Sequence, residues 1–184
     1  TAFRFGLYSG ERDGRKLRQA TIANHTQDVN TVVNYFKSRY KNIFLVGHSL
    51  GGLSILTANL KPVKGLILWD STHTLKKLEP SDRFNKYLDA YIVDWGIEIL
   101  IGKKMVGEWM GFPPPKELVK NIKVPIKIIC AGRGQLIKTG KEYYQYAHQP
   151  KALAIIKNAG HNFDEDGPEE GLFRETYAWV KKFT

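Results

Sequence analysis

One serine of this chain stands in a context that can turn its hydroxyl into a nucleophile. Residues 47–52 read Gly-His-Ser-Leu-Gly-Gly, so Ser49 occupies the centre of a Gly-x-Ser-x-Gly pattern. The pattern directly follows the apolar run Ile43–Val46 and precedes a helix candidate, Leu53–Leu60. A serine on a sharp turn from a strand into a helix presents its hydroxyl above the end of the sheet, where it can attack an acyl carbon. We therefore predict that Ser49 is the nucleophile of an acyl-transfer reaction.

The residues around this serine are part of the prediction. We expect large residues at Gly47 and Gly51 to clash in so tight a turn, and therefore expect glycine to be needed at both positions. Because a helix start favours negative charge, the backbone N–H of Leu50 is the predicted first oxyanion donor. A glycine-rich turn without chemistry stays open as an alternative. A phosphate-binding loop does not, because the sequence lacks the Gly-Lys-Ser/Thr of such loops.

Four motifs spread along the chain carry a resemblance to a known family. They are GHSLGG at 47–52, GLILWDS at 65–71, VPIKIICAG at 124–132 and NAGHNF at 158–163. With these motifs the sequence resembles the α/β-hydrolase superfamily, in particular its esterases, lipases and serine-aminopeptidase-like members. The resemblance covers nearly the whole chain from Phe3 onward. It implies a triad in the chain order serine, acid, histidine.

The resemblance places the base of the triad at His161. This histidine follows the last predicted strand, within NAGHNF, where the family carries its catalytic histidine. A loop histidine satisfied by its neighbours is the alternative. The other four histidines, at positions 25, 48, 73 and 148, lack this placement. His48 fills the variable position of the serine motif, and we interpret it as structural.

The acid of the triad is predicted from a departure from the family pattern. The family most often carries the acid just after the strand that ends near Ala131, but this chain has Gly134 where an aspartate is expected. Some members place the acid after the preceding strand, which here ends at Asp70. Catalytic groups gather at the carboxyl ends of parallel strands, so we predict Asp70. A turn-forming aspartate is the alternative, and Asp164 and Asp166 are weaker candidates.

The elements that must position these residues follow from the alternation of apolar runs with amphipathic stretches. Short runs that are apolar on consecutive positions are typical of parallel strands buried on both faces. These runs are Ala2–Tyr8, Ile43–Val46, Val63–Trp69, Ile126–Ala131 and Ala152–Ile156. Helix candidates lie at residues 29–40, 53–60, 140–147 and, with Pro168 in its first turn, 168–183. We predict an α/β fold with a mostly parallel sheet of about five or more strands flanked by helices.

A long insertion interrupts this alternation between residues 72 and 124. An insertion of this length is usually functional or a small subdomain. The resemblance makes it a cap within a single α/β-hydrolase domain that spans residues 1–184. Its apolar residues suit an acyl chain, and we predict Trp95, Met105 and Trp109 as substrate-binding residues. The alternative is that they form the core of the cap itself.

The N-terminal end departs from the family. The chain starts about where the family's fourth strand would be, at residues 3–8, so the resemblance implies an N-terminally minimal or truncated hydrolase. The family's usual motif for the second oxyanion donor is missing. We hypothesise that the loop from Leu7 to Gly10 supplies this donor, and Tyr8 is the candidate.

Composition and charge bound the class of protein. The chain has 184 residues, of which 42% are hydrophobic and 25% charged, values typical of a globular domain. The net charge is +10, but the basic residues are scattered and no nucleic-acid motif is present, so no nucleic-acid partner is expected. Attraction to an anionic membrane surface stays open. No apolar run of eighteen residues exists, and residues 1–16 do not resemble a signal peptide, so we expect a cytoplasmic protein. Cys130 is read as a buried structural thiol.

These observations together predict a carboxylic ester hydrolase. The expected partner is a small acyl ester or a lipid, and the predicted chemistry uses neither a cofactor nor a metal. Two alternatives stay open: a non-catalytic or half-enzyme binding protein, and a serine-peptidase-like activity. A homo-oligomer is compatible with the sequence, because a sheet that lacks its early strands exposes an edge.

Overall fold

The computed structural model describes residues 15–73, 75, 83–94 and 98–184. The chain divides into two compact units. The first comprises Thr1–Gln27 with Thr74–Phe112, and the second comprises Asp28–His73 with Pro113–Thr184. The second unit contains the predicted nucleophile, base and acid.

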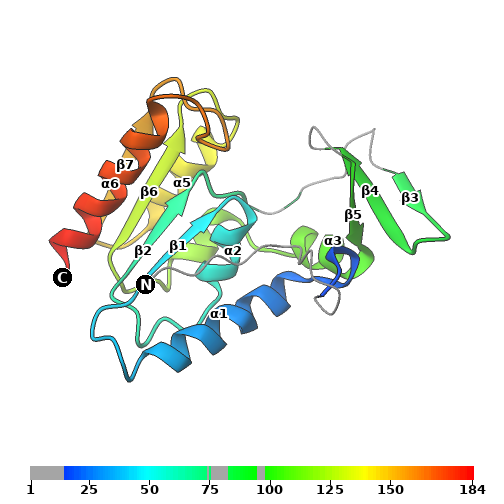
Figure 1. Ribbon diagram of the computed structural model, residues 1–184, viewed down its shortest axis with the longest axis horizontal. Coiled ribbons are helices and arrows are strands. Elements are labelled where there is room, and N and C mark those ends of the chain that lie inside the picture. The colour runs from blue at the N-terminus through cyan, green and yellow to red at the C-terminus, as the bar shows by residue number, and fades with distance from the viewer. Residues whose placement is uncertain (1–14, 74, 76–82, 95–97) are drawn as a thin grey trace. The chain divides into compact units, whose positions relative to one another are not determined.

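A parallel sheet forms the centre of the second unit. Its strand order is β1-β2-β6-β7, and every neighbouring pair is parallel (Figure 1). The four strands are β1 (Phe44–His48), β2 (Gly65–Trp69), β6 (Ile126–Ala131) and β7 (Lys151–Ile156). The predicted α/β fold is thus confirmed. The described sheet has fewer than the five or more strands predicted, and the remaining predicted strand, Ala2–Tyr8, lies outside the described residues.

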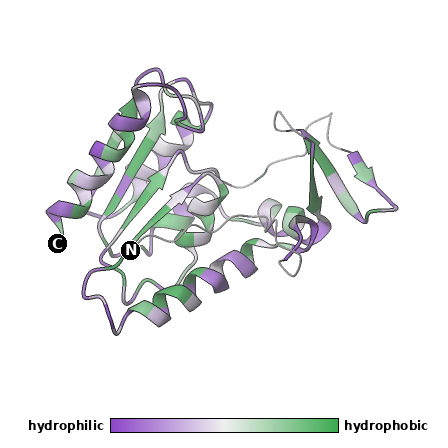
Figure 2. Ribbon diagram, viewed as in Figure 1, coloured by the Kyte–Doolittle hydropathy of each residue, from purple (hydrophilic) through white to green (hydrophobic). Residues whose placement is uncertain are grey.

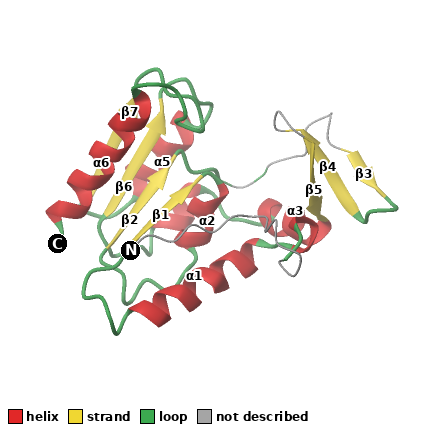
Figure 3. Ribbon diagram, in the orientation of Figure 1, coloured by secondary structure: helices red, strands yellow, loops and turns green. Residues whose placement is uncertain are grey.

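Helices cover both faces of this sheet (Figure 3). On these faces lie α2 (Leu50–Leu56), α5 (Ile137–Tyr146) and α6 (Pro168–Lys182), which contact strands of the sheet. The short helix α4 (Pro115–Val119) packs against α5, and α1 (Ile22–Phe36) belongs to the first unit up to Gln27 and to the second from Asp28. Side chains of β6 alternate between the faces, as the two-residue period of a strand requires. Ile129 and Ala131 join a core cluster with Leu172 and Trp179 of α6. Cys130 points the other way, where a Cβ added to Gly140 of α5 would collide with its Sγ.

The two central strands, β2 and β6, are mostly apolar, as expected for strands with both faces buried. Leu66, Ile67 and Leu68 of β2 are fully buried, and every residue of β6 is buried. Figure 2 shows these strands mainly in the hydrophobic colour, whereas α1 and α6 combine hydrophobic and hydrophilic residues. Within the described ranges no helix is long and apolar enough to cross a membrane.

The first unit contains most of the predicted insertion. Its antiparallel sheet has the order β3-β4-β5 and precedes a helix. These elements are β3 (Arg83–Asn85), β4 (Ala90–Asp94), β5 (Glu98–Gly102) and α3 (Lys103–Met110). The 3-10 helix η1 (Leu17–Gln19) joins them, since a Cβ at Gly102 would collide with the carbonyl oxygen of Arg18. Of the insertion expected at 72–124, residues 74–112 belong to this unit and residues 72–73 and 113–124 to the second.

Candidate active site

The turn between β1 and α2 carries Ser49 in a strained backbone conformation. Its φ of 53° and ψ of −121° lie where L-residues are rarely found. Two backbone hydrogen bonds hold the turn against the end of β2. The N–H of Ser49 donates to the carbonyl of Trp69 over 3.0 Å, and the N–H of Thr72 donates to the carbonyl of Ser49 over 3.2 Å. The neighbouring strand therefore fixes the height of Ser49 above the sheet.

Gly47 and Gly52 make this turn possible, whereas the prediction named Gly47 and Gly51. A Cβ on Gly47 would lie 2.6 Å from the carbonyl oxygen of Gly51, so no side chain fits at position 47. The prediction for Gly51 is wrong, because a Cβ there would meet nothing within 4 Å. The second close approach is at Gly52, where a Cβ would collide with Oγ of Ser71. The first turn of α2 passes close to Ser71, the residue that follows Asp70. This close approach is the reason why position 52 needs glycine.

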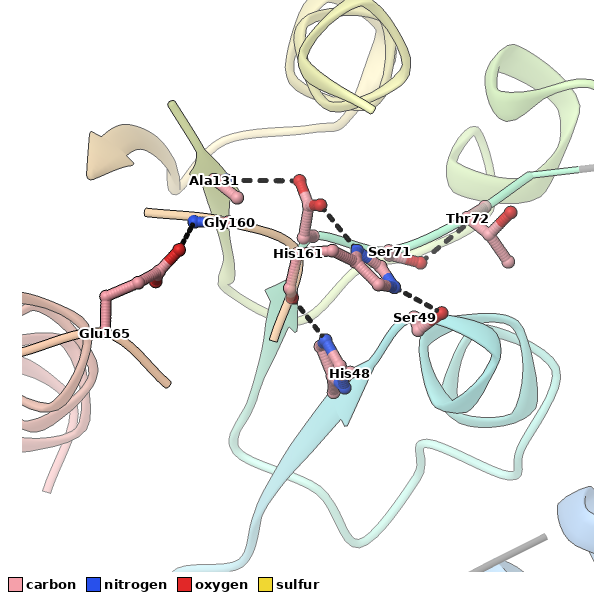
Figure 4. A network of polar contacts seen from close by, with 9 residues as sticks. His48, Ser49, Ser71, Thr72, Ala131, Gly160, His161 and Glu165 are labelled. Atoms are coloured by element: carbon pink, nitrogen blue, oxygen red, sulfur yellow. Dashed lines mark hydrogen bonds and ion pairs between the residues drawn. The ribbon is translucent and has the colours of Figure 1, made fainter. Parts of the chain in front are cut away.

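The hydroxyl of Ser49 points to an imidazole (Figure 4). Serine before a helix commonly caps it with its side chain, but Ser49 makes no such capping bond to α2. Its Oγ lies 3.0 Å from Nε2 of His161 instead. Leu50, the predicted oxyanion donor, is the first residue of α2. The first N–H groups of a helix have no acceptor within the helix, so α2 itself leaves this N–H without an acceptor.

Asp70 completes a chain of three polar side chains. It follows β2 directly, with a positive φ of 38°. Its Oδ2 lies 2.7 Å from Nδ1 of His161, and its Oδ1 accepts the N–H of Ala131 over 3.1 Å. A carboxylate can only accept, so Nδ1 of His161 carries a hydrogen and Nε2 is left to accept from the serine hydroxyl. The structure therefore joins Ser49, His161 and Asp70 by two successive hydrogen bonds.

Burial differs sharply along this chain of hydrogen bonds. The side chain of Asp70 is fully buried, whereas that of His161 is 41% exposed. A buried carboxylate with two donors on its two oxygens has a fixed orientation. The half-exposed imidazole can meet a molecule that arrives from solvent. The other candidates for the acid, Asp164 and Asp166, are exposed.

Behind the site, α5 supports the segment that follows Asp70. The hydroxyl of Tyr143 donates to the carbonyl of Thr72 over 2.7 Å. Burial raises the pKa of Tyr143 well above its ordinary value, so the phenol stays a neutral donor. Burial also raises the pKa of Cys130 to about 12, which agrees with the predicted buried, unreactive thiol.

Comparisons with known proteins address the fold. No family model matches this sequence. The esterase domain of a Rhodothermus marinus protein is 19% identical, with a TM-score of 0.67 over 86% of this chain and 69% of that one. A monoacylglycerol lipase of Paleococcus ferrophilus is 15% identical, with a TM-score of 0.65 over 90% and 77%. Est1E of Butyrivibrio proteoclasticus, solved with ferulic acid, is 17% identical, with a TM-score of 0.70 over 90% and 70%.

The chain has the α/β-hydrolase fold. The resemblance inferred from the four motifs is thereby confirmed at the level of the fold. In the second unit, His161 lies within hydrogen-bond distance of both Ser49 and Asp70.

The remaining predicted site residues of this α/β-hydrolase fold lie elsewhere or are not described. Met105 and Trp109 are 1% and 8% exposed and belong to the first unit, so each is part of the interior of that unit. Their role in binding an acyl chain stays a prediction. Tyr8 and Trp95 lie outside the described residues. Within the described ranges, no group of three or more acidic, histidine or cysteine side chains could hold a metal ion.

Two contacts of the histidine loop were not predicted from the sequence. Nε2 of His48 donates to the carbonyl of His161 over 2.8 Å, and Oε1 of Glu165 accepts the N–H of Gly160 over 2.6 Å (Figure 4). The sequence indicates only a structural role for His48 and none for Glu165. Nothing in the local sequence shows that either side chain reaches the backbone beside the imidazole.

Proposed function

We propose that this chain is a serine hydrolase that cleaves carboxylic esters, with Ser49 as nucleophile, His161 as general base and acid, and Asp70 as the group that orients the imidazole. The observation that carries the proposal is the unbroken line of hydrogen bonds from Oγ through the imidazole to Oδ2, with lengths of 3.0 Å and 2.7 Å. A nucleophile bonded to a base that is itself oriented by a third group is the arrangement that acyl transfer requires.

The first half of the proposed reaction forms an acyl-enzyme. Oγ of Ser49 attacks the ester carbonyl carbon while Nε2 of His161 takes the hydroxyl proton. The carbonyl oxygen becomes an oxyanion, and the N–H of Leu50 stabilises it. When the tetrahedral intermediate collapses, the bond to the alcohol oxygen breaks, and His161 gives its proton to the departing alcohol. Asp70 stays ionised and stabilises the imidazolium that forms between these two transfers.

The second half returns the enzyme to its starting state. His161 takes a proton from a water molecule, whose oxygen attacks the acyl carbon of the ester bond to Ser49. The bond to Oγ then breaks, Oγ receives the proton from His161, and a carboxylic acid leaves. The exposure of the imidazole supports this step, because water must reach the same nitrogen that the alcohol has just left.

The substrates we propose are esters of short or medium acyl chains. The printed names of the similar structures include an esterase domain, a monoacylglycerol lipase and a protein solved with ferulic acid. These names favour an ester over an amide, and the apolar side chains of the predicted cap suit an apolar acyl group.

Steady-state hydrolysis of p-nitrophenyl acetate and p-nitrophenyl butyrate tests the proposal, with an aminoacyl p-nitroanilide as the amide comparison. We expect hydrolysis of the esters by the wild-type chain, no measurable rate in Ser49→Ala, and a far slower anilide reaction. Ser38→Ala removes an exposed serine hydroxyl outside the site and serves as the matched control. Equal ester rates in wild type and Ser49→Ala would overturn the proposal, and a preference for the anilide would replace the ester with a peptide bond.

A further inference from the structure

We propose that His48 and Glu165 are positioning residues that grip the backbone of Gly160 and His161 from two directions and so hold the imidazole between Ser49 and Asp70. The inference rests on the proposed function and adds to it two residues that touch neither substrate nor reacting atoms. Figure 4 shows Glu165 beside the backbone of Gly160 and His48 beside that of His161.

The loop that carries His161 needs such support. It runs from residue 157 to 167, between the end of β7 and the start of α6, so neither a helix nor a strand fixes the backbone of the histidine. Asn158 and Phe163 have positive φ values of 64° and 56°, which mark tight reversals of the chain. The imidazole is 41% exposed and therefore lacks close packing on every side. Its position depends on what holds the loop backbone.

His48 holds the carbonyl of His161. A carbonyl oxygen only accepts, so Nε2 of His48 carries the hydrogen in this 2.8 Å bond. The two imidazole rings also lie face to face at a tilt, with centroids 4.8 Å apart and planes 37° apart. His48 is the chain neighbour of Ser49. Its bond thus ties the backbone of the base directly to the strand end that carries the nucleophile.

Glu165 holds the N–H of Gly160 through Oε1 over 2.6 Å. Glycine at position 160 permits this approach, because a Cβ there would lie 2.6 Å from the same oxygen and the carboxylate would have to move. Arg133 forms an ion pair with Oε1, and its own backbone N–H donates to the carbonyl of Ala159 over 2.9 Å. The carboxylate and the arginine that neutralises it therefore hold two consecutive residues of the loop.

The burial of the second carboxylate oxygen of Glu165 lowers the stability of the fold. Oε2 is buried, and no partner for it lies within the part of the chain that the structure describes. A buried charged oxygen without a hydrogen bond destabilises the fold. The strong bonds of Oε1 to Gly160 and Arg133 offset that cost. A carboxylate kept at such a place by contacts to the histidine loop fits a role in holding that loop.

The two hydrogen bonds act on adjacent residues. Glu165 accepts from the N–H of Gly160, and His48 donates to the carbonyl of His161. Releasing either contact lets the loop shift, and Nε2 of His161 moves relative to Oγ of Ser49, while none of the predicted substrate-binding residues is changed. A displacement of about 1 Å of a reacting group costs on the order of a hundredfold in rate. Loss of either hydrogen bond should therefore lower kcat and leave KM near its wild-type value.

Paired variants at each position test this. His48→Phe keeps a ring but removes the donor, and His48→Gln restores an N–H donor at a similar reach. Glu165→Leu removes the acceptor, and Glu165→Gln restores one. We expect kcat for p-nitrophenyl butyrate to fall about 10- to 100-fold in His48→Phe and Glu165→Leu, with KM unchanged and substantial recovery in the two amide variants. His148→Phe and Asp166→Leu, at exposed positions, are the matched controls.

A double-mutant cycle separates positioning from a merely structural role. In a His161→Ala background no imidazole remains to be positioned, so His48→Phe and Glu165→Leu should lower the residual rate no further, whatever their effect on Tm. Equal losses of kcat in both backgrounds, or wild-type kcat in His48→Phe and Glu165→Leu, would overturn the inference.

A readout that does not depend on turnover keeps this outcome distinct from failure of the proposed function. The hydrogen on Nδ1 of His161 gives a proton NMR signal, assigned by its absence in His161→Ala. We expect this signal to exchange faster with water in His48→Phe and Glu165→Leu than in the wild type. Unchanged exchange in both variants contradicts the positioning role even if the chain hydrolyses no ester, whereas an inactive wild type with faster exchange in the variants contradicts only the proposed function.

Discussion

The carboxylate of Asp70 occupies the space that a side chain at Gly134 would need: a Cβ on Gly134 would lie 2.9 Å from Oδ2. Position 134 is where the family resemblance leads one to expect the acid. Both positions therefore face the same space beside Nδ1 of His161, from the ends of the neighbouring strands β2 and β6. The absence of an aspartate at position 134 is thus linked to the presence of Asp70, because glycine at 134 leaves room for the Asp70 carboxylate.

A methyl group at position 134 is accordingly expected to disturb the acid. Gly134→Ala should lower kcat for p-nitrophenyl esters by about tenfold or more, because Oδ2 must move away from Nδ1 and small displacements of catalytic groups are costly. Steady-state kinetics check this. Gly107→Ala is the control, because a Cβ at Gly107 meets nothing within 4 Å. A fully active Gly134→Ala enzyme would show that Asp70 tolerates the displacement.

Asp70→Asn separates the orientation of the imidazole from the packing around it. The amide has nearly the same shape and tolerates a positive φ, so the fold should survive. Its NH₂ group favours the wrong tautomer of His161, and in serine proteases the equivalent change lowers kcat by about 10⁴-fold. We expect a loss of at least about a hundredfold here, measured together with Tm. Asp166→Asn is the control for a change of charge alone, and a near-normal rate in Asp70→Asn would transfer the role to another residue.

The glycines of the serine turn should differ in their tolerance. Gly51→Ala is expected to keep or raise stability, by up to about 1 kcal/mol, because alanine is favoured over glycine in a helix and the space is open. Gly47→Ala must push against the backbone of Gly51 and should destabilise the chain by about 1–3 kcal/mol. Urea unfolding of the two variants measures both changes. The opposite order would contradict the close approach described at Gly47.

The ion pair of Glu165 predicts a dependence of stability on pH. Burial raises the pKa of its carboxyl, but the N–H of Gly160 and the guanidinium of Arg133 outweigh this and lower the pKa below its ordinary value. A lowered pKa in the folded state stabilises the fold above the pKa of the unfolded chain, and this contribution is lost as the pH falls through the folded value. The difference in unfolding free energy between wild type and Glu165→Gln should therefore shrink on acidification below the ordinary carboxyl range. A constant difference between neutral and acid pH would contradict the shift.

The sequence predicts those site residues that lie directly after a strand. Ser49 and Asp70 follow buried strands whose apolar runs are visible in the sequence, and parallel strands bring their carboxyl ends to one edge of the sheet. The motif after β7 predicts His161. These predictions needed only the order of elements, and the parallel arrangement β1-β2-β6-β7 supplied the rest.

Side-chain contacts across the fold could not be predicted in the same way. The bond from His48 joins residues 113 positions apart, and it depends on the path of the loop that follows β7. The need for glycine at position 52, and its absence at 51, depends on where α2 crosses Ser71. Such contacts follow from the register of strands and the tilt of helices, which the alternation of apolar runs does not determine.

Labelling with a fluorophosphonate tests the central claim most directly, since the probe reacts only with a serine whose hydroxyl is activated by a base. Intact-mass and peptide mapping of the folded wild-type chain should show a single adduct, located on Ser49. The adduct should be absent in Ser49→Ala and should form far more slowly in His161→Ala. A well-folded wild-type chain that takes up no probe, or one that carries the adduct on another residue, would contradict the account.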